Sequence, residues 1–146
     1  METVTNRVLM QFPSNAANIG FARTAIAVFA SQLDFTLDEL DEIKIAVSEA
    51  VSNAVIHGYE GCVGQISVMC TLTENYIEIC VQDGGKGMAD VEKALEPAFT
   101  TQPDERMGLG LVFVKEYMDE VSIDSAIGKG TSLIMRKSPV EARVGS

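Results

Sequence analysis

The sequence has no long apolar run, few basic residues and no cysteine cluster, and each absence excludes a class of protein. Nowhere do eighteen apolar residues follow one another, and no charged leader opens the chain, so neither a membrane span nor secretion is expected. Lys and Arg number 11 against 21 Asp and Glu, which argues against direct nucleic-acid binding and favours a basic protein partner. Three cysteines without metal-type spacing predict reduced thiols and a cytoplasmic location.

The common motifs of ATP-using enzymes are also missing. The chain has no phosphate-binding G-x-x-x-x-G-K-S/T sequence, and it lacks the H-R-D and D-F-G motifs of ordinary protein kinases. If this protein uses ATP, it must therefore do so through a different fold.

What is present is the composition of one folded domain. The 146 residues are 47% hydrophobic and 22% charged, without a repeat or linker, so we expect a single domain over residues 1–146 with a dispensable, disordered tail after about Ser138. Hydrophobic periodicity predicts strands over 4–12, 65–72 and 76–83, helices over about 19–32, 36–58, 89–98 and 108–120, and two last strands over 121–137.

The predicted helix from Thr36 to Gly58 is the best delimited element. Thr36 and Glu39 form a capping-box pattern, and Gly58 is a typical stop. One face is apolar, and the nearly opposite face is expected to form one wall of a cleft. The apolar face comprises Leu40, Ile43, Val47, Val51 and Ala54, and the other Glu42, Ala46, Glu49, Asn53 and His57.

Glu49 and Asn53 lie one helical turn apart on that second face. An amide carbonyl is a hard oxygen ligand suited to Mg²⁺, and a carboxylate beside it can act as a base. The alternative is a solvated acid next to a packing amide with satisfied hydrogen bonds. The helix by itself does not decide between these interpretations.

Two glycine-rich segments suggest a nucleotide. "DGGKGM" begins with Asp83 at a strand end, where a carboxylate can accept a hydrogen bond from an adenine amino group while the glycines admit the ring. "GLGLVF" places Gly108 and Gly110 at the front of a predicted helix, where backbone N–H groups favour phosphate. The alternatives are an ordinary hairpin turn and glycines kept for conformational reasons.

The order of these motifs is more specific than any one of them. Glu-x-x-x-Asn, two strands, Asp-x-Gly-x-Gly, a polar loop, Gly-x-Gly and a final "GKGT" resemble the ATPase superfamily of gyrase, Hsp90, histidine kinases and MutL. "QLDFTLDELDEIK", "SEAVSNAVIHGY", "FTTQPDER" and "YMDEVSIDSAIGKGT" are similar to its compact anti-sigma kinases of spore-forming bacteria. The resemblance implies an α+β, two-layer α/β sandwich of the Bergerat type, with a mixed, mostly antiparallel sheet and helices on one face.

The resemblance also implies roles for individual residues around ATP and Mg²⁺. Asn53 would hold Mg²⁺, Glu49 would be the general base, and Asp83 would recognise adenine between Gly85 and Gly87. Arg106, on a lid over about residues 98–107, would be catalytic by neutralising the γ-phosphate during transfer. The remaining assignments are Gly108, Leu109 and Gly110 at the phosphates, Thr101 and Thr131 as further nucleotide-binding residues, and Arg23 at a partner surface.

The function implied is a serine protein kinase that is also an anti-sigma factor. It would sequester a sporulation sigma factor, phosphorylate a serine of the anti-anti-sigma protein, and form a homodimer. A nucleotide-sensing anti-sigma module without phosphate transfer is the alternative. The ATPase domain of a DNA-linked machine is disfavoured by the acidic charge.

Overall fold

The computed structural model describes residues 3–58, 63–84, 105–126 and 130–140, with only the backbone of 57–58, 105–110 and 126. These residues form a five-stranded sheet in the order β1-β2-β3-β5-β4. Its elements are β1 (Val4–Pro13), α1 (Ala17–Ala30), α2 (Leu37–Asn53), a π-helical turn η1 (Ala54–Gly58), β2 (Gln65–Thr73), β3 (Ile77–Asp83), α4 (Glu105–Tyr117), β4 (Glu120–Ala126) and β5 (Gly130–Lys137).

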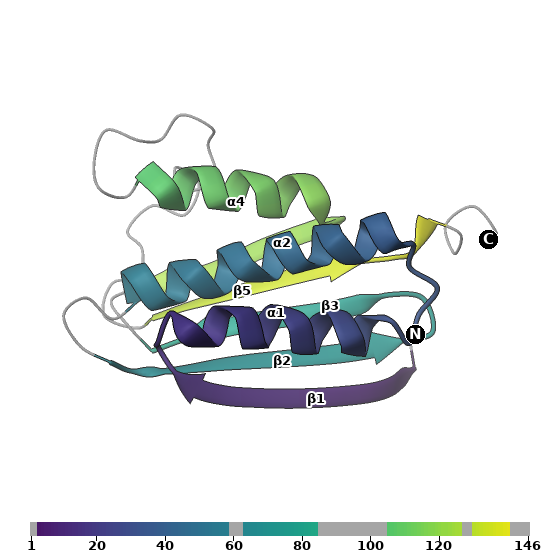
Figure 1. The fold of residues 1–146 in the computed structure, drawn as a ribbon, viewed down its shortest axis with the longest axis horizontal. Coiled ribbons are helices and arrows are strands. Elements are labelled where there is room, and N and C mark those ends of the chain that lie inside the picture. Colours follow the sequence, from purple (N-terminus) through teal and green to yellow (C-terminus); the bar gives the residue numbers. More distant parts are fainter. Residues whose placement is uncertain (1–2, 59–62, 85–104, 127–129, 141–146) are drawn as a thin grey trace.

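The helices α1, α2 and α4 lie side by side over one face of the sheet, with α2 in the middle (Figure 1). The predicted α+β sandwich is therefore confirmed. The four strand pairings among the described residues are all antiparallel, whereas the expectation of a mixed sheet had allowed a parallel pair.

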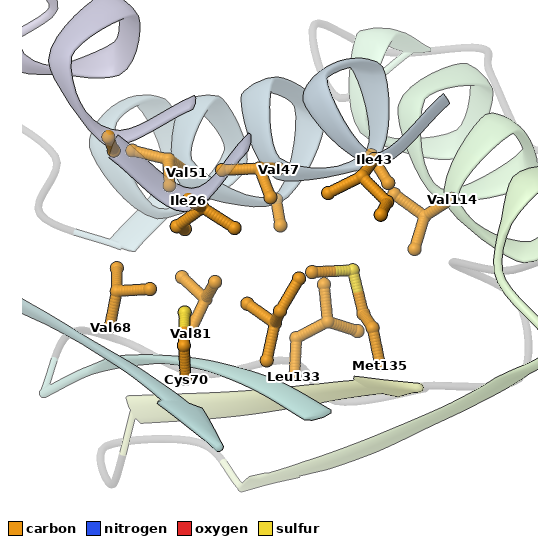
Figure 2. Close-up of a cluster of buried hydrophobic side chains, with 14 of the residues drawn as sticks. Ile26, Ile43, Val47, Val51, Val68, Cys70, Val81, Val114, Leu133 and Met135 are labelled. Atoms are coloured by element: carbon orange, nitrogen blue, oxygen red, sulfur yellow. The ribbon is translucent and has the colours of Figure 1, made fainter. Parts of the chain in front are cut away.

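The core is a single apolar layer between helices and sheet. Helix side chains including Ile26, Val47 and Val114 face strand side chains including Val68 and Leu133 (Figure 2). Burial of such side chains stabilises a fold by about 1.5–3 kcal/mol each. This layer fixes α2 over the sheet, and α2 carries Glu49 and Asn53.

Helix α2 begins with the capping box that the sequence predicts. The Oγ1 atom of Thr36 accepts a hydrogen bond from the Glu39 N–H at 3.1 Å, and Oε1 of Glu39 accepts one from the Thr36 N–H at 2.9 Å. Val47 and Val51 are buried against the sheet, and Ala46 on the second face is buried as well. Both faces are covered because α2 packs between α1 and α4.

Helix α4 starts earlier than the glycines suggest. It begins at Glu105, so Gly108 and Gly110 lie inside its backbone instead of at its front. Each glycine weakens a helix by about 1 kcal/mol relative to alanine, but Leu111 and Val114 are buried and hold α4 onto the core. The predicted helix over 89–98 lies outside the described residues.

The chain after β5 is fastened to the domain as far as Val140. The N–H of Ser138 donates to Oδ2 of Asp119 at 2.7 Å, Pro139 is buried, and the N–H of Val140 donates to Oε2 of Glu39 at 3.0 Å. The sequence placed the start of a dispensable tail at about Ser138. Residues 138–140 contact the domain, and residues 141–146 lie outside the described part.

Two of the three cysteines can be located, and both are unpaired. Burial raises the pKa of the Cys70 thiol to about 12, so Cys70 stays protonated at neutral pH. The pKa of Cys80, which is half-buried, is raised first by burial and then by the Glu78 carboxylate. Cys62 lies outside the described residues. None of the described helices is both long and apolar enough to cross a membrane.

We predict that Glu39→Ala destabilises the domain by about 2–3 kcal/mol, because it removes the carboxylate half of the capping box and leaves the Val140 N–H without its acceptor. Urea unfolding at pH 7 measures this. Asp38→Ala is the matched control, since Asp38 is exposed in the same helical turn, and it should cost less than about 1 kcal/mol. Equal losses for the two variants would contradict the role given to Glu39.

Candidate functional site

Four chain segments that the sequence marks as functional meet at one edge of the molecule. The C-terminal end of α2, the start of α4 and the start of β5 lie on the left of the view (Figure 1). The turn η1 contacts both β3 and β5. The end of β3 lies beside the start of β5, because Asp83 pairs with Thr131.

Asn53 is the last residue of α2, and the hydrogen bonding of its side-chain amide is incomplete among the described residues. Its Nδ2 atom is buried and has no hydrogen-bond partner among the described residues. A buried donor left unpaired costs about 1–3 kcal/mol, so this position fits a ligand that brings an acceptor oxygen, such as a phosphate. The carbonyl oxygen of the same amide is a ligand type that Mg²⁺ prefers, and the residues present therefore fit a magnesium-bound nucleotide.

Glu49 lies one turn before Asn53 and is half-buried. Directly after Asn53 the helix widens from α to π geometry, in η1. Such π-helical turns occur frequently at functional sites. The sequence predicted one continuous helix to Gly58, because the wider turn leaves no trace in the spacing of apolar residues.

Asp83 ends β3 as a buried carboxylate, only 7% exposed. It continues the phase of Ile79 and Val81, so it is on the helix-covered side of the sheet, as the sequence predicts. Its cross-strand neighbours are Ile66 on β2 and Thr131 on β5. The carboxylate is thus fixed at the boundary between the apolar core and the open end of the site.

Gly130 is a site residue that the sequence did not single out. Its φ is 81°, and a Cβ placed there would lie 2.2 Å from the carbonyl oxygen of Asp83 and 2.8 Å from Cα of Gly84. Only glycine allows this close approach of the two strands. The sequence pattern indicated a glycine turn but not the close contact between Gly130 and the backbone of Asp83.

Arg23 on α1 and Glu49 on α2 line the same hollow, which measures about 550 Å³. Its other lining residues are Asp41, Lys44, Ile45 and Ser48. The Ser48 Oγ is buried and has no hydrogen-bond partner in the described part of the chain. The structure therefore brings the predicted base and the predicted partner residue to one surface.

Several predicted site residues cannot be placed in this geometry. Gly85, Gly87 and Thr101 lie outside the described residues, and of Arg106, Gly108, Leu109 and Gly110 only the backbone in α4 is described. Their roles in binding base, phosphate and lid stay predictions.

The comparison with known proteins agrees with this arrangement. A family model described as the histidine kinase-like ATPase domain matches residues 12–137. The chain belongs to this ATPase family. ATP binding follows from membership, and the roles of Asn53 and Asp83 in it stay predictions.

Similar sequences within the family carry one recurring name. The chain is 47% identical over 134 residues to an "Anti-sigma F factor" of Thermoanaerobacter sp., covering 91% of this chain and 94% of that relative. It is 44% identical over 134 residues to the "Anti-sigma F factor" of Bacillus subtilis, covering 90% and 92%. The resemblance to anti-sigma factors is confirmed.

Solved structures agree on the fold. The RsbU and RsbW domains of Rv1364c from Mycobacterium tuberculosis match with a TM-score of 0.66 at 20% identity, over 92% of this chain and 32% of that one. The mycobacterial sensor histidine kinase MprB matches with a TM-score of 0.58 at 18% identity, over 90% and 97%. These structures share the architecture of the family.

We predict that Gly130→Ala weakens ATP binding and destabilises the fold by more than about 1 kcal/mol, because the new methyl group displaces Asp83 and the positive φ becomes strained. Titration calorimetry with Mg-ATP and thermal unfolding measure the two effects. Gly20→Ala is the control, since its Cβ would meet only Nη2 of Arg23 at 3.7 Å. ATP affinity unchanged in Gly130→Ala would refute the link to Asp83.

Proposed function

We propose that the protein is an ATP-dependent serine protein kinase and anti-sigma factor. In this proposal it sequesters a sporulation sigma factor and phosphorylates a serine of the anti-anti-sigma protein. The observation that supports it most directly is the position of Glu49 one helical turn before Asn53, whose buried Nδ2 atom has no hydrogen-bond partner among the residues that the structure describes. A carboxylate one turn from a metal ligand is in the position of a general base.

The phosphate transfer is a single in-line displacement. The serine oxygen of the partner attacks the γ-phosphorus of ATP, the bond between that phosphorus and the bridging oxygen breaks, and ADP leaves. The carboxylate of Glu49 accepts the serine proton. The amide carbonyl of Asn53 would hold Mg²⁺, and the bound ion would supply neutralisation of charge on the leaving group.

The hollow between Arg23 and Glu49 is the surface on which we place the partner. It opens beside the proposed base, and its lining has the carboxylates of Asp41 and Glu49 beside the cations of Arg23 and Lys44, with Lys44 paired to Asp41. Phosphorylation adds nearly two negative charges to the partner, and the whole protein carries a net charge of −10. Repulsion of the phosphorylated product frees the surface for the sigma factor.

The alternative is an anti-sigma module that binds nucleotide without transferring phosphate. Binding alone requires Asn53 and Asp83 but no carboxylate at position 49. The half-buried Glu49 at the hollow therefore favours the enzyme.

A homodimer and a cytoplasmic location also belong to the proposal. Strand β1 lies at one edge of the sheet described here. Edge strands leave backbone groups available for pairing with a second chain. Sedimentation equilibrium of the full chain distinguishes monomer from dimer.

We predict that Glu49→Gln lowers the rate of phosphate transfer to the anti-anti-sigma protein by at least about 100-fold, because the amide cannot accept the serine proton. ATP affinity should change little. Transfer of labelled γ-phosphate to serine measures the rate, and calorimetry measures the affinity. Glu74→Gln, in the exposed β2–β3 turn, is the control. Transfer at the wild-type rate with ATP still bound would show that Glu49 is not the base, whereas ATP binding without any transfer by the unmodified chain would leave the binding-module alternative.

Arg23→Ala should weaken binding of the anti-anti-sigma protein and sigma factor by at least about 10-fold if the guanidinium makes a charge-assisted hydrogen bond to the partner. ATP binding should stay unchanged. Surface-immobilised binding assays with both purified partners measure the loss. Arg7→Ala is the matched control, since Arg7 is exposed on β1 and contacts Oγ1 of Thr71. Equal losses in the two variants would show that net charge alone is responsible.

A further inference from the structure

A row of side chains crosses the sheet at the edge where the site lies. The strand register aligns Phe12, Ile66, Asp83, Thr131 and Ser125 from β1 to β4. All five are on the helix-covered side, because Asp83 lies on that side and residues paired directly across neighbouring strands share a face. The first two are buried apolar residues, and the last three are polar. Ser125 is thus the outermost member of a polar group that contains two proposed nucleotide contacts.

The Ser125 hydroxyl makes two hydrogen bonds, one to the Gly130 carbonyl and one to the Thr131 hydroxyl, and the first bears on which hydroxyl donates in the second. Its Oγ donates to the carbonyl oxygen of Gly130 at 3.0 Å and lies 2.8 Å from Oγ1 of Thr131. A serine hydroxyl has one proton, and a backbone carbonyl can only accept. The 2.8 Å distance allows either hydroxyl to donate in the second bond. The assignment of that proton to Thr131 follows if the Ser125 proton is given to the Gly130 carbonyl, which cannot donate.

The consequence concerns what Thr131 can offer a ligand. With its proton directed to Ser125, the Thr131 hydroxyl presents only lone pairs to other groups. Its cross-strand neighbour Asp83 carries a carboxylate, which is also an acceptor when ionised. Two neighbouring acceptors match a ligand amino group and oppose a carbonyl.

We propose that Ser125 is a positioning residue that sets the base specificity of the nucleotide site. By taking the Thr131 proton it holds that hydroxyl as a hydrogen-bond acceptor for the 6-amino group of adenine. The inference rests on the proposed placement of the adenine beside Asp83 and Thr131. Ser125 itself acts through Thr131 and the Gly130 carbonyl.

The test compares ATP with inosine triphosphate, in which a carbonyl replaces the 6-amino group. In Ser125→Ala the Thr131 hydroxyl is released and can turn its proton toward that carbonyl. The affinity for inosine triphosphate should rise relative to ATP, so that the ratio of the two dissociation constants shifts about 3- to 10-fold, the value of one hydrogen bond. Titration calorimetry with the full chain and Mg²⁺ measures both constants without depending on phosphate transfer.

Three matched variants separate this role from a general effect on the fold. Ser125→Thr keeps the hydroxyl and should keep the wild-type ratio. Ser122→Ala removes a serine from the same strand on the opposite, exposed face, and should also keep it. In a Thr131→Val background, Ser125→Ala should no longer shift the ratio, because the group through which it acts is gone.

Each outcome decides the inference. An unchanged ratio in Ser125→Ala overturns it while leaving ATP binding intact, and so does a shift that persists in the Thr131→Val background. Equal affinity of the wild type for both nucleotides overturns it as well. Absence of any ATP binding removes the proposed function together with the inference. If Ser125→Ala does not fold, Ser125→Cys, a weak donor of similar size, must produce the same shift.

Discussion

The antiparallel register between β3 and β5 is the constraint on which the site depends. It sets Asp83 opposite Thr131 and brings Gly130 against the Asp83 backbone at a distance that only glycine permits. A slip of β5 by one residue would turn Thr131 and the other side chains of that strand to the opposite face of the sheet. The same register places Leu133 and Met135 in the core, so the burial that stabilises the sheet also fixes the polar end of β3.

In helix α2, too, the interactions that stabilise the fold also fix the position of a site residue, Asn53. Its capping box, its buried valines and the bond from Glu39 to Val140 fix it between its neighbours. That rigidity allows the last turn to keep the buried Nδ2 of Asn53 without a hydrogen-bond partner in the described part of the chain, at a cost of about 1–3 kcal/mol. Unsatisfied groups of this kind persist where the surrounding packing tolerates them, and binding of a ligand that supplies an acceptor recovers the cost.

Local signals explain which parts of this architecture could be predicted. The capping box of Thr36 and Glu39 involves groups three residues apart, so the sequence pattern contains it fully. Alternation along β3 predicted the side on which Asp83 lies. By contrast, the bond from Val140 to Glu39 joins residues 101 positions apart, and no local pattern records it. The early start of α4 was missed because glycines weaken a helix without ending it when buried neighbours such as Leu111 hold it.

The sequence by itself determined the succession of the strands and helices that the structure describes, the ATPase family and the candidate residues Glu49, Asn53 and Asp83, because periodicity depends on neighbouring positions and motif order is read directly along the chain. Only the tertiary structure decided that Arg23 shares a hollow with Glu49, that the Cα of Gly130 lies against the backbone of Asp83, and that the Ser125 and Thr131 hydroxyls lie within hydrogen-bond distance. These relations depend on strand register and helix packing, which bring together residues that are far apart along the chain.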